Sequence, residues 1–192
     1  MCHRNISLDT IAMDGDHVDI IGLGWALQCN NSKAVSQDAN GDDKSRYFPP
    51  TSGCSDPRFI APESFHYQSS SNKDSSGTTD GADRVWNGFS DDLWATGLIL
   101  YSMVVGTDAL FTLPIAGNKI FTRLCIKGDI RGEAERSGNL LSDDLVILLQ
   151  SMLNADPKQR SVLEHVMVHP WVTNDEPAIT PTKCTELHRI TP

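Results

Sequence analysis

The sequence predicts a mainly α-helical fold built around one buried helix, with a short β-hairpin near the N-terminus. Residues 90–105 are apolar or small on nearly every face, which is typical of a helix that other elements cover. Further segments with helical spacing of apolar residues follow at 119–127, 142–155 and 161–169. Asp14-Gly15 lies between two short strand-like stretches and predicts the turn of the hairpin.

The central helix is predicted to begin at Ser90-Asp91-Asp92, whose side-chain oxygens can accept hydrogen bonds from the first helical turn. Gly106 is placed to end it. The apolar stretch is too short to span a bilayer, which requires about 20 residues. Asp92 would be largely buried at the start of this helix, so it requires a specific hydrogen-bond donor.

Composition narrows the classes of protein and of partner. The chain has 192 residues, which favours one domain, and its formal net charge of −9 argues against nucleic acid or an anionic membrane as a partner. Its five cysteines form no C-x-x-C pair, so neither a disulfide framework nor a zinc site is indicated. No signal peptide is visible, and we expect a cytoplasmic or nuclear, reducing compartment.

Two stretches lack any periodicity and are predicted to be loops. Residues 28–58 form a long loop, and residues 68–82 form a polar, low-complexity insert. The insert is interpreted as a surface insertion, with a phosphorylated regulatory tract as the alternative. Residues 173–192 are predicted to be an irregular tail behind one domain that occupies residues 1–172.

Short motifs occur along the chain in one fixed order. They are His3-Arg4-Asn5-Ile6-Ser7-Leu8-Asp9-Thr10, Ile20-Ile21-Gly22-Leu23-Gly24, Ala61-Pro62-Glu63, Asp92-Leu93-Trp94-Ala95-Thr96-Gly97, and Asp156-Pro157-Lys158-Gln159-Arg160 with His169-Pro170-Trp171. Each is weak alone. Together they resemble the C-terminal lobe of a eukaryotic serine/threonine protein kinase, and the resemblance covers roughly residues 2–172.

The resemblance implies which residues hold the scaffold together. In this family, the acid at the position of Asp92 accepts backbone N–H groups from the catalytic loop, here His3-Arg4-Asn5. The glutamate at the position of Glu63 pairs with the arginine at the position of Arg160, whose planar guanidinium suits a carboxylate. We therefore expect His3, Arg4 and these three residues to be structural.

The same resemblance implies that the positions used for phosphoryl transfer are altered. The catalytic aspartate is replaced by Asn5, whose amide is not basic, and the loop lysine is replaced by Ser7. The two magnesium ligands are replaced by Thr10 and Gly22, so the carboxylate that magnesium prefers is missing. A loop threonine that bonds the catalytic aspartate is replaced by Asp56.

Several nearby residues are weaker candidates for chemistry. Asp9 and Asp19 are the acids closest in sequence to the missing ligands, but their positions do not favour substitution for them. His165 and His169 are four residues apart without an evident third metal ligand, so no metal site is predicted. In the family, Arg4 can pair with an activation-loop phosphate, for which the candidates here are Thr51, Ser52 and Ser55; the simpler interpretation is contact with loop carboxylates.

The motifs begin two residues after Met1, so we expect this chain to lack the nucleotide-binding N-terminal lobe. No cofactor is then expected from the chain itself. ATP and Mg²⁺ would be expected only if that lobe exists and activity is retained. The surface left uncovered should be apolar, which favours a protein partner.

Three functions remain open. The leading hypothesis is a kinase-like domain that is catalytically inactive, a pseudokinase or interaction module. The second is an active protein serine/threonine kinase of which this sequence is an incomplete fragment. The third is a truncated relic without function.

Overall fold

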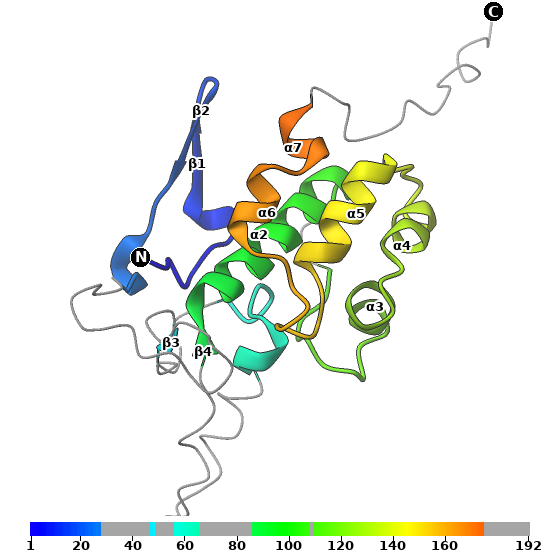
Figure 1. Cartoon of the computed structure of the whole chain (residues 1–192), viewed down its shortest axis with the longest axis horizontal. Helices are drawn as coiled ribbons and strands as arrows, with labels where there is room; N and C mark the ends of the chain where they lie inside the picture. The colour runs from blue at the N-terminus through cyan, green and yellow to red at the C-terminus, as the bar shows by residue number, and fades with distance from the viewer. Residues whose placement is uncertain (28–46, 49–55, 66–85, 108–109, 175–192) are drawn as a thin grey trace, which may run out of the picture.

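The structure is a computed structural model that describes residues 1–27, 47–48, 56–65, 86–107 and 110–174. The predicted insert at 68–82 lies outside the described residues, as does the predicted tail at 173–192 from residue 175 on; Thr173 belongs to a helix and not to an irregular tail. Thr51, Ser52 and Ser55 also lie outside the described residues. The described part is mainly helical, as predicted, with helices gathered around α2 and a hairpin projecting from one side (Figure 1).

The central helix α2 spans Gly88–Val105 and ends at Gly106, which adopts the left-handed conformation at φ 73°. The predicted cap at Ser90-Asp91-Asp92 is wrong, because the Asn87 side chain caps the helix by accepting from Phe89 N and Ser90 N. Asp91 in the first turn and Asp92 directly after it are therefore available for contacts with other segments.

The other helices pack on one another and on α2. Their bounds are Lys119–Phe121 (α3), Ile130–Arg136 (α4), Asp143–Met152 (α5), Leu163–Met167 (α6) and Pro170–Thr173 (α7). Ser142 caps α5 as predicted. Helix α4 was not predicted; the Asp129 side chain caps it by accepting from Gly132 N.

Two predicted helices differ in detail from the structure. The stretch 119–127 begins as α3 but widens into a π-helix at Thr122–Ile126 before Gly128 stops it at φ 66°. The capping box predicted at Ser161 does not form, because Val162 is the cap residue and Ser161 Oγ donates to the Val162 carbonyl instead. Pro170 then starts the separate helix α7, since proline fits a first helical turn but not its interior.

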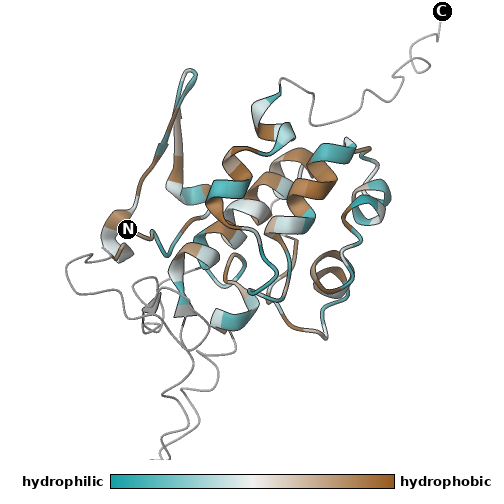
Figure 2. Ribbon diagram, in the orientation of Figure 1, coloured by the Kyte–Doolittle hydropathy of each residue, from teal (hydrophilic) through white to brown (hydrophobic). Residues whose placement is uncertain are grey.

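The core lies between α2 and its neighbours. Trp94 and Leu98 of α2 pack with Leu145 and Leu149 of α5, and each of these side chains is at most 1% exposed. Both ribbons are largely brown in the hydropathy view (Figure 2). Gly97 allows the close approach, because a Cβ atom there would lie 3.0 Å from side-chain atoms of α5 and the residue after it.

The predicted hairpin consists of β1 (Ile11–Asp14) and β2 (His17–Ile20), which pair antiparallel with Asp14 opposite His17. Gly15 occupies the turn at φ 59°. A second two-stranded ladder, β3 (Tyr47–Phe48) with β4 (Trp86–Asn87), was not predicted. Within the described residues, no helix is both long and apolar enough to cross a membrane.

Candidate functional site

The N-terminal loop (residues 3–10) is fixed to the start of α2 by one carboxylate. Asp92 Oδ2 accepts from His3 N at 2.6 Å, and Asp92 Oδ1 accepts from Arg4 N at 2.7 Å. The contact expected from the resemblance is therefore present. Burial raises the pKa of Asp92 above its usual range, while the two backbone donors oppose this shift by favouring the charged form.

This anchoring holds an unusual backbone conformation. Arg4 is buried at φ 67°, and it is the one residue other than glycine with a positive φ among the described residues. Such a conformation is strained for an L-residue and persists only where surrounding contacts enforce it. The two hydrogen bonds to Asp92 are contacts of this kind.

His3 joins the N-terminal loop to the segment after β2. Its ring is buried, with Nε2 lying 2.9 Å from the Ile21 carbonyl oxygen and Nδ1 accepting from Asn5 N at 3.3 Å. His3 Nε2 therefore carries the proton that is donated to Ile21. One imidazole ring thus links Asn5 to Ile21, the residue before Gly22.

Thr10, at one of the expected magnesium positions, uses its hydroxyl within the loop. Thr10 Oγ1 accepts from Ser7 N at 2.9 Å, and its hydroxyl proton can be donated to the carbonyl of Ser7 at 3.0 Å or of Asn5 at 3.1 Å. Both Thr10 and Ser7 are buried. The hydroxyl therefore closes a turn of backbone, and its oxygen faces donors and acceptors of the loop itself.

Gly22, at the second expected magnesium position, lies directly against Thr10. Its backbone is left-handed at φ 82°, and a Cβ atom built on it would be 3.2 Å from Thr10 Cγ2. The neighbouring Ile21 N also donates to Thr10 O at 2.9 Å. The Thr10 methyl group thus crowds the space that a side chain at position 22 would enter.

Magnesium does not fit this set of donors. The ion prefers carboxylate and water oxygens in near-octahedral geometry. Asn5 offers a neutral amide, the Thr10 hydroxyl is engaged in the loop, and Gly22 has no side chain. Among the residues that the structure describes, no cluster of three or more histidine, cysteine or acidic side chains could hold a metal ion.

The substitute acids considered from the sequence lie elsewhere. Asp19 is exposed on β2, where it contacts His17 at 3.3 Å, and Asp9 is exposed in the N-terminal loop. His169 Nδ1 accepts from Trp171 N at 3.3 Å, which makes it the cap of α7. None of these side chains is brought together with Thr10 or Gly22 by a described contact.

A second anchor joins residues 61–65 to the end of the domain. Arg160, whose side chain is fully buried, donates to both carboxylate oxygens of Glu63 at 2.7 and 2.9 Å. The same guanidinium donates to the Ser90 carbonyl at 3.1 Å and stacks over the Trp94 ring, with Cζ 4.9 Å from its centroid. This is the ion pair expected from the resemblance.

Asp56, at the altered loop-threonine position, pairs with a neighbour instead. Arg58 donates to it from Nε and Nη2, with the shortest contact at 2.6 Å. The side-chain hydrogen bond from Arg58 is the main cause that lowers the pKa of Asp56. Asp56 is thereby held as a carboxylate in a local turn.

The role of Asp91 was not predicted. This buried carboxyl group accepts from Ala61 N at 3.0 Å and from Ser64 Oγ at 3.1 Å. Burial is the main cause that raises its pKa to about 7, and the nearby charge of Glu63 adds to the effect. The sequence signal is the pair of adjacent acids Asp91-Asp92 at a helix start, and a tertiary contact was predicted for Asp92 alone.

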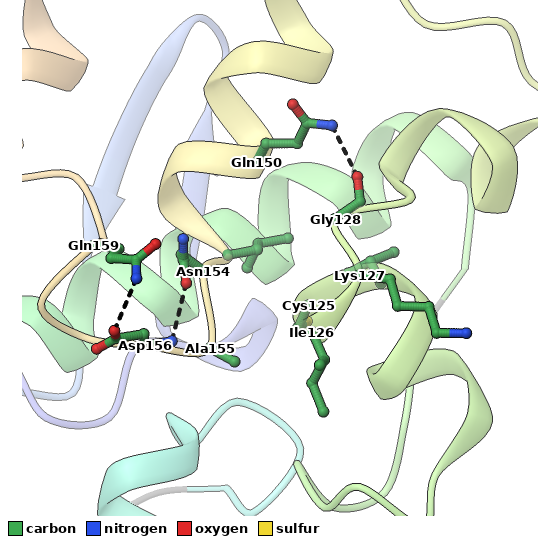
Figure 3. Close-up of a pocket in the computed structure, with 11 residues that line it drawn as sticks. Cys125, Ile126, Lys127, Gly128, Gln150, Asn154, Ala155, Asp156 and Gln159 are labelled. Carbon is green, nitrogen blue, oxygen red and sulfur yellow. Dashed lines mark hydrogen bonds between the residues drawn. The ribbon is translucent and has the colours of Figure 1, made fainter.

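A pocket of about 550 Å³ lies apart from this cluster, between the π-helix and the turn after α5 (Figure 3). None of its lining residues belongs to the N-terminal loop or to the segment around Gly22. Its carboxamides make local hydrogen bonds: Gln150 donates to the Gly128 carbonyl, Asn154 accepts from Asp156 N, and Gln159 donates to Asp156 Oδ2. The candidate site is therefore the N-terminal loop with Gly22.

Restoring an aspartate at position 22 provides a direct test of the Thr10–Gly22 contact. We expect Gly22→Asp to lower the free energy of unfolding by about 1–2 kcal/mol more than Gly15→Asp, measured by urea denaturation. Gly15 is a matched control, because it is also left-handed but has no atom within 4 Å of an added Cβ. Thr10→Ser combined with Gly22→Asp should recover part of the loss; equal costs for the two aspartates would contradict the crowding.

The order of the motifs, the anchored loop and the helical architecture all agree with the comparisons with known proteins. Residues 1–172 match the protein kinase domain family. The chain belongs to this family.

Individual relatives are protein kinases by name. The chain is 34% identical over 122 residues to a calcium/calmodulin-dependent protein kinase kinase of Caenorhabditis elegans, covering 62% of this chain and 18% of that protein. It is 31% identical over 134 residues to the probable serine/threonine-protein kinase fhkA of Dictyostelium discoideum, covering 62% of this chain and 22% of that protein. The chain thus spans about a fifth of the length of these relatives.

Proposed function

We propose that this chain is a kinase C-terminal-lobe domain that does not transfer phosphate and acts as a pseudokinase, through contacts with another protein. The observation that carries the proposal is the Thr10–Gly22 contact. One former ligand position now closes a loop, and the other has lost its side chain to a left-handed glycine packed against it. The two positions that hold magnesium in the family therefore pack against each other in this chain.

The proposal also rests on the chemistry of Asn5. Phosphoryl transfer relies on positioning and on neutralising the charge of the transferred group, with a carboxylate that accepts the hydroxyl proton. An amide oxygen is not basic enough for that role. The base and both metal ligands are altered together, so no single neighbouring change restores the reaction.

Phosphotransfer on the purified chain tests the proposal. We expect radiolabelled phosphate incorporation into itself and into generic serine/threonine substrates, with Mg²⁺ or Mn²⁺, to equal that of an Asn5→Ala variant. We also expect no thermal stabilisation by 1 mM Mg-ATP, whereas a site with a Kd of about 10 µM would gain about 2.7 kcal/mol. Incorporation above the Asn5→Ala level would overturn the proposal.

The surface of the hairpin supports a protein partner. The register pairs Met13 with Val18 and Ile11 with Ile20, which places these four apolar side chains on one face. Met13 is 72% exposed, and Val18 and Ile20 are each 54% exposed. Ile11 is half-buried against the core, so the uncovered part of this face consists of the other three side chains. An uncovered apolar strand face is typical of an interaction surface.

A second candidate is an active serine/threonine kinase to which this chain contributes the C-terminal lobe. The observation that favours it is the intact scaffold, since the Asp92 and Arg160 anchors are both present. The two candidates differ in the activity expected of the protein translated from the full-length transcript. Phosphotransfer that is lost in Asn5→Ala would favour the second candidate. Phosphotransfer that survives Asn5→Ala would not depend on the N-terminal loop and would not favour the second candidate. A functionless relic is the third candidate, and a non-cooperative thermal transition would favour it.

A further inference from the structure

The start of α2 and the segment at residues 56–65 (the docked segment) meet at a buried acid. Asp91 Oδ1 alone accepts both hydrogen bonds from the docked segment, from Ala61 N and Ser64 Oγ. Arg160 adds a polar bridge between the two regions by joining Glu63 to Ser90, and Phe59 and Ala61 lie in the same apolar core as Trp94 of α2. Asp91 is therefore the one ionisable side chain of α2 that binds the docked segment directly, within the described residues.

The surroundings of Asp91 are poor in positive charge. Glu63 of the docked segment and Asp92 of α2 both repel a charge on Asp91. Arg160, from the turn after α5, is bound to Glu63, and no described lysine, arginine or histidine forms an ion pair with Asp91. On the remaining side, the backbone of His3 and Arg4 in the N-terminal loop is bound to Asp92.

We propose that Asp91 is a proton-operated latch, which holds the docked segment against α2 when protonated and loosens it when ionised. A charge at this buried place would have to be accommodated beside two other acids with only two neutral donors. Opening of the docked segment gives the carboxylate access to water. The ionised form therefore favours the open state, independently of whether the chain transfers phosphate.

The direction of the pH effect follows from the two protonation equilibria. In the closed state the pKa of Asp91 is about 7, and in the open state it returns towards 3.8. The closed state therefore binds the extra proton between these values, and its advantage is complete at low pH and is lost as pH rises towards neutrality. Within this window, each pH unit should raise the ratio of open to closed chains by up to about tenfold.

Hydrogen exchange of the docked segment tests the latch on the full chain. The amides of Ala61 and Phe65 report on it, because they donate to Asp91 and to the Ala61 carbonyl. After correction for intrinsic exchange rates, we expect their protection factors to fall by up to about tenfold per unit from pH 5 to 7 and to level off above about 7.5. A pH-independent protection factor over this range would overturn the proposal.

Variants separate the latch from general acid sensitivity. Asp91→Asn should remove the pH dependence, whereas Asp16→Asn, a change to an exposed acid in the hairpin turn, should leave it intact. Ser64→Ala removes a hydrogen bond that lowers the pKa of Asp91, so the loss of protection should move to higher pH. This second variant keeps the test decisive where Asp91→Asn does not fold; an unchanged midpoint there would count against the latch.

Discussion

Replacing Glu63 by alanine is expected to lower the free energy of unfolding by about 3–5 kcal/mol, because it leaves the Arg160 guanidinium buried without its carboxylate. The pair is bidentate, and the arginine side chain is fully buried while that of Glu63 is 24% exposed. The penalty arises mainly from the uncompensated cation. Urea denaturation should show it as a lower midpoint with an unchanged slope.

A surface ion pair provides the matched control for this prediction. Arg131 pairs with Asp143, and the two side chains are 44% and 86% exposed. Asp143→Ala should therefore cost less than about 1 kcal/mol. Equal losses for the two variants would show that the buried pair has no special role. Replacing Glu63 and Arg160 together by leucine and methionine should recover much of the loss, since no unpaired charge remains.

Replacing Asp92 by asparagine is expected to cost about 2–4 kcal/mol and to release the N-terminal loop. The carboxylate accepts one backbone N–H on each oxygen. An asparagine offers one acceptor oxygen only, and its NH₂ group would face a second N–H donor. The strained backbone of Arg4 would then lose a contact that maintains it.

Two measurements check this second prediction. The free energy of unfolding should fall in Asp92→Asn, and amide exchange at His3 and Arg4 should become fast under conditions where the chain remains folded. Asp9→Asn is the control, because Asp9 is exposed in the same loop. Slow exchange at both amides in Asp92→Asn would show that other contacts hold the loop.

The central helix and the hairpin could be predicted because their signals are local. The unbroken apolar stretch, Gly106 and Asp14-Gly15 each act within a few residues. The two long-range anchors, Asp92 with the N-terminal loop and Glu63 with Arg160, were expected only through the resemblance to kinases. Nothing in the spacing of residues 88 or more positions apart indicates that they touch.

The features that were missed depend on competition between neighbouring side chains. Asn87 caps α2 in place of the predicted Ser90-Asp91-Asp92, and Asp91 is therefore free to accept hydrogen bonds from the docked segment. The π-helix at Thr122–Ile126 has the same apolar spacing as an ordinary helix over so short a length. The contact between Thr10 and Gly22 joins two segments through a turn, so their packing cannot be read from either one.

The Thr10–Gly22 contact also limits which single substitutions the two positions can accept without loss of stability. A side chain regained at position 22 alone meets the Thr10 methyl group and a left-handed backbone. Replacing Thr10 alone by a residue without a hydroxyl, such as asparagine, removes the group that closes the loop. Each single change towards the family's metal-ligand residues is therefore expected to cost stability, so the two positions are expected to change together or not at all.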